Sequence, residues 1–280
     1  HRCRLDRSPL ASRLVTAPII APTDLSHLGG LFDLSDRVAI VTGASSGLGR
    51  RFARVLHGAG ATVVAAARRA ELLDELAEEL GERLVPHAAD VANEPDVEAL
   101  VERAMACRGR IDVVVNNAGI GGAVPAEDET MTQWRRTMAV NVDGLFHLSQ
   151  LAGRHMLDAG SGSIVNIASI LGLVAAAPIK QAAYCASKGA VVNLTRELAG
   201  QWGRRGIRVN AIAPGWFLSE MTAEEMFADE RSMQFVRRNT PMGRPGEAHE
   251  LDGALLFLAS DASSFVTGQI LAVDGGWTAR

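Results

Sequence analysis

Short apolar runs alternate with longer stretches of helical spacing along most of the chain. The runs are rich in Val, Ile and Ala and predict buried strands at Val38–Val41, Thr62–Ala66, Leu84–His87, Ile111–Val115, Ser163–Ile167, Ile207–Ala211 and Gln269–Val273. Helices are predicted near 47–58, 69–80, 94–107, 130–159, 181–203 and 246–260. Strands that are apolar on both faces and separated by helices are typical of a parallel sheet covered on both sides. We therefore predict an α/β fold with a single doubly wound sheet of about seven parallel strands.

Two parts of the chain lie outside this alternation. Residues 1–30 are rich in arginine and proline, so we predict that 1–35 is a poorly ordered N-terminal extension, with a transit peptide as the alternative. One domain is then expected over 36–280. Within it, 214–245 shows neither strand nor helix pattern, and we predict that it covers a substrate site, a surface helix being the alternative.

Composition excludes several classes of protein. The chain is 48% hydrophobic and 21% charged, which suits a large core rather than disorder. Its net charge of −4 gives no basic footprint for nucleic acid. No apolar run is long enough for a spanning helix, the three cysteines form no disulfide framework, and the histidines lack metal-site spacing. We expect a cytoplasmic protein that binds neither metal, membrane nor nucleic acid.

A glycine-rich turn follows the first predicted strand and leads into a helix. Its sequence is Thr42-Gly43-Ala44-Ser45-Ser46-Gly47-Leu48-Gly49. Glycine permits close backbone approach, and a helix start offers N–H groups and a positive dipole end to a pyrophosphate. The turn therefore predicts dinucleotide binding. The segment Gly43–Gly47 also fits G-x-S-x-G, so a serine hydrolase that uses Ser45 is an alternative, although its place after the first strand disfavours it.

The second predicted strand ends without an acid. Many NAD-binding sites carry an acid at that place to bind a ribose hydroxyl. Here Arg68 and Arg69 follow instead, and guanidinium groups suit a 2′-phosphate. The chain is therefore predicted to prefer NADP(H). NAD(H) remains open, because both arginines would also suit a solvated helix start.

Tyr184, which is the one tyrosine of the chain, lies four residues before Lys188 in a predicted helix. Residues four apart share one helix face. A phenol has an ordinary pKa of about 10, and a nearby ammonium lowers that pKa because it favours the phenolate. The pair therefore predicts a group that exchanges a proton near neutral pH. A helix surface pair is the alternative.

Together these motifs resemble the short-chain dehydrogenase/reductase family over about residues 37–277. The matching residues are Thr42-Gly43-x3-Gly47-x-Gly49, Asn116-Asn117-Ala118-Gly119, Ser169, Tyr184-x3-Lys188 and Pro214-Gly215. The resemblance implies a Rossmann fold and hydride transfer between NADP(H) and a ketone or secondary alcohol. The expected cofactor contacts are Gly43, Ser45, Ser46, Gly47, Leu48, Gly49, Arg68, Arg69, Asp90, Val91, Asn117, Ala118, Gly119, Tyr184, Lys188, Pro214, Gly215 and Ser219.

The resemblance also implies four catalytic residues. Tyr184 would be the general acid/base, and Lys188 would lower its pKa and hold the nicotinamide ribose. Ser169 would bond the substrate carbonyl oxygen. Asn141 would hold a water that relays protons from Lys188. A nucleotide sensor without catalysis is the alternative, which the presence of all four residues disfavours.

Substrate and assembly are less constrained. Apolar residues expected near the substrate favour a neutral ketone, namely Ile170, Leu171, Pro178, Ile179 and Trp216. A sugar or sugar-acid dehydrogenase that uses NAD is an alternative, because the two ends of the domain resemble such members. A 3-oxoacyl thioester reductase is disfavoured, since His147 and Gly200 occupy positions where those members carry arginine. The family implies a homotetramer or homodimer.

Overall fold

The computed structural model describes residues 26–217 and 230–279. Contacts within the chain divide it into His1–Leu31 and Phe32–Arg280. In the first unit, a short 3-10 helix covers Ser26–Gly30. In the second, Leu34 is fully buried and its amide donates to the Ala59 carbonyl. The sequence pattern predicted that the domain begins at Asp36. The contacts place its beginning a few residues earlier, at Phe32.

Seven parallel strands form one sheet in the order β3-β2-β1-β4-β5-β6-β7. They are β1 Val38–Thr42, β2 Thr62–Ala67, β3 Leu84–Ala88, β4 Val113–Asn116, β5 Gly162–Ile167, β6 Ile207–Pro214 and β7 Ile270–Val273. The predicted fold class is confirmed. The strand order reverses at β1, which pairs with β2 on one side and β4 on the other. In such sheets ligands bind at this switch point, beyond the carboxyl ends of the strands.

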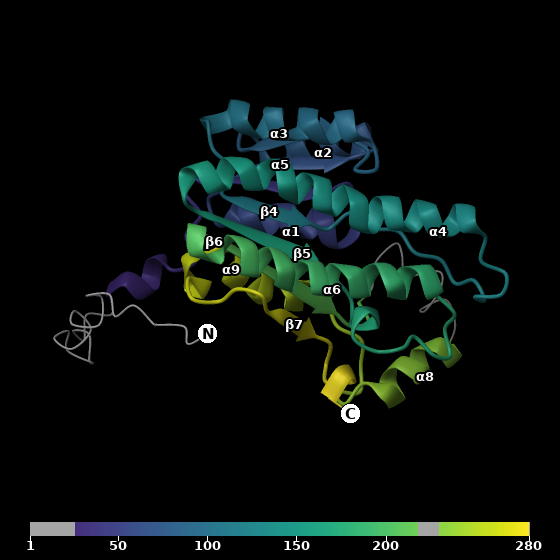
Figure 1. Ribbon diagram of the computed structural model, residues 1–280. Helices are drawn as coiled ribbons and strands as arrows, with labels where there is room; N and C mark the ends of the chain where they lie inside the picture. Colours follow the sequence, from purple (N-terminus) through teal and green to yellow (C-terminus); the bar gives the residue numbers. More distant parts are fainter. Residues whose placement is uncertain (1–25, 218–229, 280) are drawn as a thin grey trace, which may run out of the picture. The chain divides into compact units, whose positions relative to one another are not determined.

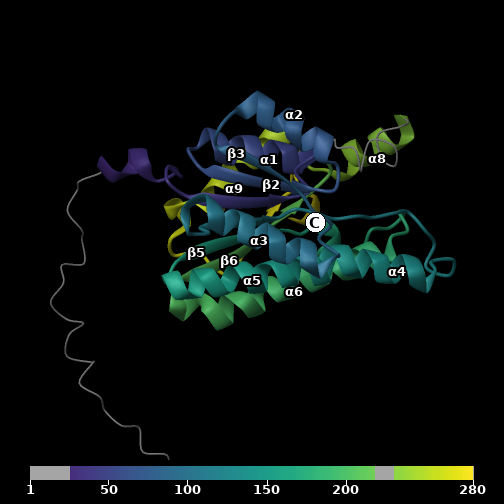
Figure 2. The ribbon, with the colours of Figure 1, turned by 90° about the horizontal axis from the view of Figure 1, so that it is seen from above.

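Helices cover both faces of the sheet (Figures 1 and 2). One layer holds α1 Gly47–Gly58, α2 Ala70–Leu80 and α9 Asp252–Ala259, and the other holds α3 Glu94–Arg108, α5 Gly144–Ala159 and α6 Ala182–Trp202. Successive strand side chains point to opposite faces. Thus Ala39 and Val41 of β1 join the core under α1 and α2, whereas Val38 and Ile40 join the core under α3 and α5. This explains why the apolar residues of β1 occupy consecutive positions instead of alternating with polar ones.

The predicted helix over 130–159 has three parts. Helix α4 covers Met131–Met138 and begins at a capping box between Thr130 and Gln133. A π-helical turn follows at Ala139–Asp143, and α5 then begins at Gly144. A Cβ on Gly144 would collide with the Val91 carbonyl, so this glycine allows close packing after β3. The expectation of one regular helix is therefore wrong at 139–143.

The predicted irregular segment over 214–245 is partly helical. Helix α8 covers Glu230–Asn239 and buries Val236. Residues 218–229 lie outside the described part of the chain. Across residues 26–217 and 230–279, no helix combines the length and apolarity needed to cross a membrane. The same residues hold no cluster of three His, Cys, Asp or Glu side chains placed for a metal ion.

Candidate active site

A cleft of about 500 Å³ opens at the carboxyl ends of the strands, at the switch point beside β1. Predicted residues that line it are Gly43, Ser45, Ser46, Gly47, Leu48, Gly49, Arg68, Arg69, Asp90, Val91, Asn117, Ala118, Gly119, Ser169, Tyr184, Lys188, Pro214 and Gly215. Ser219 lies outside the described residues. Sequence reasoning missed Ala66, Ala67, Ala89, Ile120, Val140, Ile167, Ala168 and Phe217. Most of these residues lie at or just after the carboxyl end of a predicted strand. That position was a signal from which they could have been predicted.

The glycine-rich turn forms a tight backbone cradle at the start of α1. Gly43 has a φ of +66°, which favours glycine, and a Cβ there would lie 2.8 Å from Asn117 Nδ2. A Cβ on Gly49 would collide with the Gly43 carbonyl oxygen. Ser46 is the first cap residue of α1 and provides no side-chain capping bond. The first amides of α1 therefore remain for an anion, and the cradle fits a pyrophosphate.

Two side chains fix the cradle against the next strand. The Thr42 hydroxyl oxygen accepts hydrogen bonds from the amides of Asn117 and Ala118, both at 3.0 Å. Asn117 Nδ2 donates to the Thr42 carbonyl at 2.9 Å. These bonds join the ends of β1 and β4 across the switch point. Asn117 thus supports the cleft from a loop whose contact with β1 spans 75 residues of sequence.

A cationic corner lies beside the cradle at the end of β2. Arg69 Nη2 donates to Ser45 Oγ at 3.1 Å and to Ser46 Oγ at 2.7 Å. Arg68 is exposed and also lines the cleft. Among the described lining residues, the one acid is Asp90, which follows β3. The corner therefore presents guanidinium and hydroxyl groups, the donors that bind a phosphate. The serine hydrolase alternative requires a histidine base beside Ser45. Ser45 Oγ instead accepts from Arg69, which cannot act as that base.

Lys188 and Tyr184 lie together where α6 meets the cleft. Lys188 is buried, and its Nζ donates to the Ile167 carbonyl at 2.7 Å. That Nζ lies 5.7 Å from the centroid of the partly exposed Tyr184 ring. Burial lowers the pKa of Lys188 to about 8. At pH 7 the ammonium is therefore still mostly protonated and places a positive charge beside the phenol.

Ser169 lies at the end of β5, where the strand turns into a short 3-10 helix at Ile170–Gly172. Its Oγ accepts a hydrogen bond from the Leu171 amide at 3.1 Å. No described residue accepts the hydroxyl hydrogen of Ser169, and the residue lines the cleft with Tyr184. The structure therefore brings three of the four predicted catalytic residues, Ser169, Tyr184 and Lys188, to one wall.

Asn141 lies behind that wall, in the π-helical turn, and is almost fully buried. Its Nδ2 donates to the Ile120 carbonyl at 2.8 Å and to Ser187 Oγ at 2.9 Å. Its Oδ1 accepts from the Ile120 amide at 2.8 Å. Both amide hydrogens are thus committed to protein oxygens. The side chain thereby holds the cleft loop through Ile120, and the water expected at Asn141 stays a prediction.

The apolar residues expected around the substrate lie elsewhere. Ile170, Leu171, Trp216 and Ile179 belong to a packed cluster that also includes Tyr184, and neither they nor Pro178 line the cleft within the described residues. Trp216 packs edge to face against Trp277 with ring centroids 5.5 Å apart. The expectation of an apolar substrate pocket stays a prediction; within the described residues, Ile170, Leu171 and Trp216 pack together in a buried cluster.

Fold and site together define a dinucleotide-dependent oxidoreductase, with a glycine-rich backbone cradle and the Tyr184–Lys188 pair lining one cleft. A family model described as enoyl-(acyl carrier protein) reductase matches residues 43–278. The chain belongs to the short-chain dehydrogenase/reductase family. Its relatives are dehydrogenases, and the chain is an oxidoreductase that acts on a CH–OH group.

Similar proteins share nearly the whole domain. Gluconate 5-dehydrogenase of Gluconobacter oxydans is 43% identical over 251 residues, which cover 89% of this chain and 97% of that protein. Galactitol 2-dehydrogenase (L-tagatose-forming) of Cereibacter sphaeroides is 44% identical over 250 residues, 89% of this chain and 97% of that protein. A crystal structure of gluconate 5-dehydrogenase from Burkholderia cenocepacia, in complex with NADP and tartrate, is 39% identical, covers 91% of this chain and 100% of that chain, and has a TM-score of 0.85.

Proposed function

We propose that this protein interconverts a secondary alcohol and a ketone with NADP(H), and that Tyr184 is its general acid/base. The observation that carries this proposal is the placement of Tyr184 beside the buried Lys188 ammonium in the same cleft as the glycine cradle. The positive charge favours the phenolate and lowers the free energy of proton transfer through Tyr184. Ser169 would donate its unused hydrogen to the same substrate oxygen, which stabilises negative charge developing there.

NADP(H) is the proposed cofactor because the cleft offers the groups that would hold it. The cradle over Gly43–Gly49 would bind the pyrophosphate, and Arg68 with Arg69 would bind the 2′-phosphate. Asp90 and Val91 would lie along the adenine, and Pro214 with Gly215 along the nicotinamide. When bound, the nicotinamide supplies or accepts the hydride. Lys188 would use two ammonium hydrogens that no described residue accepts to hold the ribose hydroxyls.

The substrate class that we propose is a polyol or sugar acid. Relatives with that printed activity match at 43% and 44% identity over 89% of this chain. Of the residues that favoured an apolar ketone, Ile170, Leu171 and Trp216 pack within a buried cluster and do not line the described cleft. The wall beside Tyr184 presents hydroxyl groups, and hydroxyl-rich substrates need such donors and acceptors.

Tyr184→Phe tests the acid/base assignment. Removing the phenolic proton should lower kcat by about 10³, within the range found for general acids and bases. NADPH binding, followed by nicotinamide fluorescence, should stay within twofold, since the ring is retained. Galactitol and gluconate with NADP⁺, and a simple ketone with NADPH, form the substrate panel. Cys185→Ala, one residue along the same helix, is the control and should keep its activity.

Retention of more than a tenth of the wild-type kcat in Tyr184→Phe would contradict the role of Tyr184. If the wild-type protein turned over no alcohol or ketone of the panel while binding NADPH, the proposed substrate class would be wrong. If it bound neither NADPH nor NADH, the proposed function would fail altogether.

A further inference from the structure

Three buried hydroxyls on the helices make the same pair of hydrogen bonds. Each accepts from the Nδ2 of an asparagine and donates to a carbonyl one turn earlier in its own helix. The sets are Ser149 with Asn116 (2.9 Å) and the Leu145 carbonyl (2.7 Å), Thr195 with Asn166 (2.9 Å) and the Val191 carbonyl (2.7 Å), and Ser187 with Asn141 (2.9 Å) and the Tyr184 carbonyl (2.8 Å). All three hydroxyl residues are fully buried.

These three pairs differ in what the asparagine holds. Asn116 and Asn166 are strand residues of β4 and β5, and Asn116 Nδ2 also donates to Asn166 Oδ1 at 2.8 Å. Those two pairs attach α5 and α6 to the sheet. Asn141 instead lies in the π-helical turn, and its other bonds go to the backbone of Ile120 in the loop after β4. Ser187 is therefore the member of the set that is joined to the cleft.

The Ser187 hydroxyl and the Ile120 backbone require the same orientation of the Asn141 amide. A serine hydroxyl has one hydrogen, and that hydrogen goes to the Tyr184 carbonyl. Ser187 Oγ can then only accept, so Asn141 must present its NH₂ group to it. This orientation is the one in which Oδ1 meets the Ile120 amide and Nδ2 meets the Ile120 carbonyl. If the amide were reversed, Nδ2 would face the Ile120 amide and Oδ1 would face the Ile120 carbonyl, so donor would meet donor and acceptor would meet acceptor.

The backbone held in this way borders the catalytic pair. Ile120 and Gly119 line the cleft. A Cβ on Gly119 would lie 3.4 Å from Asn141 Oδ1 and 3.4 Å from Lys188 Nζ, so this backbone lies directly against the ammonium. The next glycine, Gly121, lies against the Tyr184 ring, since a Cβ there would be 3.0 Å from a ring carbon. A shift of the loop would therefore change the space around both residues.

We propose that Ser187 is a positioning residue for the reaction. Through Asn141 it fixes the Gly119–Ile120 backbone against Lys188 and Tyr184. It acts through Asn141 and does not line the cleft. This inference rests on the proposed function of Tyr184 and Lys188. It does not depend on which alcohol is the substrate.

Ser187→Ala and Ser149→Ala are matched variants that test this role. Each removes a fully buried serine hydroxyl that bonds one asparagine and one helix carbonyl. We expect similar losses of the urea midpoint in both. Only Ser187→Ala should lower kcat, by about tenfold, a change in barrier of about 1.4 kcal/mol, because positioning errors act on the reacting geometry. KM for the alcohol should stay within twofold. Equal kcat values in the two variants would overturn the proposal.

Amide hydrogen exchange gives a readout that needs no turnover. The Ile120 amide donates to Asn141 Oδ1, so exchange in a peptide covering 118–122 should quicken in Ser187→Ala and stay unchanged in Ser149→Ala. Faster exchange in both variants, or in neither, would contradict the role. If Ser187→Ala does not fold, Ser187→Cys keeps the volume while weakening both bonds and is measured in the same way. If the wild type turned over no substrate while exchange still quickened in Ser187→Ala and not in Ser149→Ala, only the proposed function would be contradicted.

Discussion

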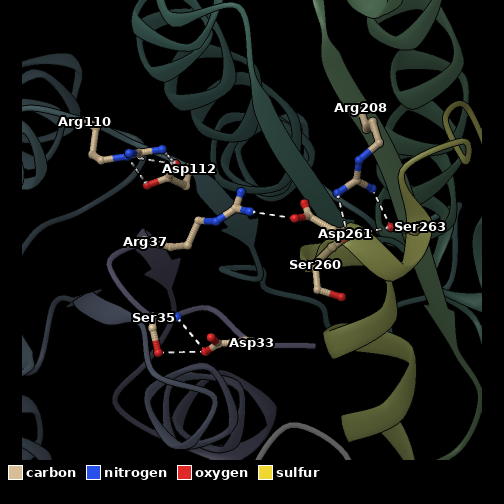
Figure 3. Close-up of polar contacts among 9 residues, drawn as sticks. All are labelled: Asp33, Ser35, Arg37, Arg110, Asp112, Arg208, Ser260, Asp261 and Ser263. Carbon is tan, nitrogen blue, oxygen red and sulfur yellow. Dashed lines mark hydrogen bonds and ion pairs between the residues drawn. The ribbon is translucent and has the colours of Figure 1, made fainter. Parts of the chain in front are cut away.

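The two ends of the sheet each contain a cation, the partly buried Arg208 at one end and the buried Lys188 at the other, and the two cations are bonded differently. At the amino end, Arg208 of β6 donates to the Leu258 carbonyl. It also donates to the Ser260 carbonyl and to Ser263 Oγ (Figure 3). At the carboxyl end, Lys188 has three ammonium hydrogens, and one described acceptor, the Ile167 carbonyl, takes one of them. Three described oxygens accept hydrogen bonds from the arginine, whereas one described oxygen accepts a hydrogen bond from the lysine.

Charge pairing shows the same difference. At the amino end, Arg110 pairs with the buried Asp112, and Arg37 pairs with Asp261 at 2.9 Å (Figure 3). Asp112 also accepts the Val38 amide at 2.8 Å, where β1 begins. At the carboxyl end, no described carboxylate lies within salt-bridge distance of Lys188. Ion pairs join opposite charges at the amino end, whereas the Lys188 charge at the carboxyl end has no ion pair among the described residues; under the proposed function it would face the cofactor and the phenolate.

The pH dependence of stability should sharpen this contrast most. The pKa of Lys188 is about 8 in the fold, against an ordinary value of 10.5. Between these pH values the unfolded chain binds the additional proton, so stability rises with pH; below pH 8 the full cost of burying the ammonium is present, and above pH 10.5 it is absent. That cost is about 3 kcal/mol. The free energy of unfolding, measured with urea, should be higher for Lys188→Met than for the wild type near pH 7. This difference should disappear as the pH approaches 10.

A stability difference between wild type and Lys188→Met that did not change with pH would mean that Lys188 is solvated. The cofactor is left out of this experiment, since the bound molecule would interact with the ammonium. Arg208→Met is the control at the opposite end of the sheet. Burial lowers the pKa of Arg208 as well, but an arginine keeps its proton throughout this pH range. Its stability difference from wild type should therefore stay nearly constant between pH 7 and pH 10.

Asp112→Ala should destabilise the amino end of the sheet without changing the geometry of the cleft. The substitution removes the acceptor of the buried Val38 amide, and an unsatisfied buried donor costs about 2 kcal/mol. We expect the free energy of unfolding to fall by about that amount, while kcat and the affinity for NADPH per folded molecule stay unchanged. Urea titration together with steady-state rates measures both. A fall in kcat at temperatures where the variant is fully folded would show that the two ends are coupled.

The exposed pair at the amino end should matter least. Arg37 and Asp261 keep 30% and 67% of their side chains exposed, so solvent screens their attraction. We expect Arg37→Ala to lower the free energy of unfolding by less than about 0.5 kcal/mol. Thermal unfolding at low and at 1 M salt checks this value. A loss as large as that of Asp112→Ala would mean that this pair is part of a cooperative network with Arg208.

Most of the carboxyl end could be predicted from sequence, because its chemistry follows local patterns. The glycine turn, Arg68 with Arg69 and the Tyr184–Lys188 spacing are each contained in a few consecutive residues. The amino end could not be predicted, since Asp112 meets Val38 across 74 residues and Arg37 meets Asp261 across 224. Only the strand order brings such residues together.

The helix break at 139–143 and the packing of Trp216 were missed for related reasons. The sequence around Asn141 has ordinary helical spacing, and the π-helical turn depends on bonds to Ile120 and Ser187 from other elements. Likewise, Trp216 is apolar enough for either a pocket or a core. Its packing against Trp277 decides between them, and that contact joins two separate elements.

The most direct test of the central claim, that the carboxyl end is an NADP(H) site, is a fluorescence titration of the wild type and of Arg69→Ala with NADPH and with NADH. Arg110→Ala, at the amino end, is the control. We predict that the wild type binds NADPH at least tenfold more tightly than NADH, that Arg69→Ala loses this preference, and that Arg110→Ala keeps it. Tighter binding of NADH by the wild type, or binding of neither, would contradict the account.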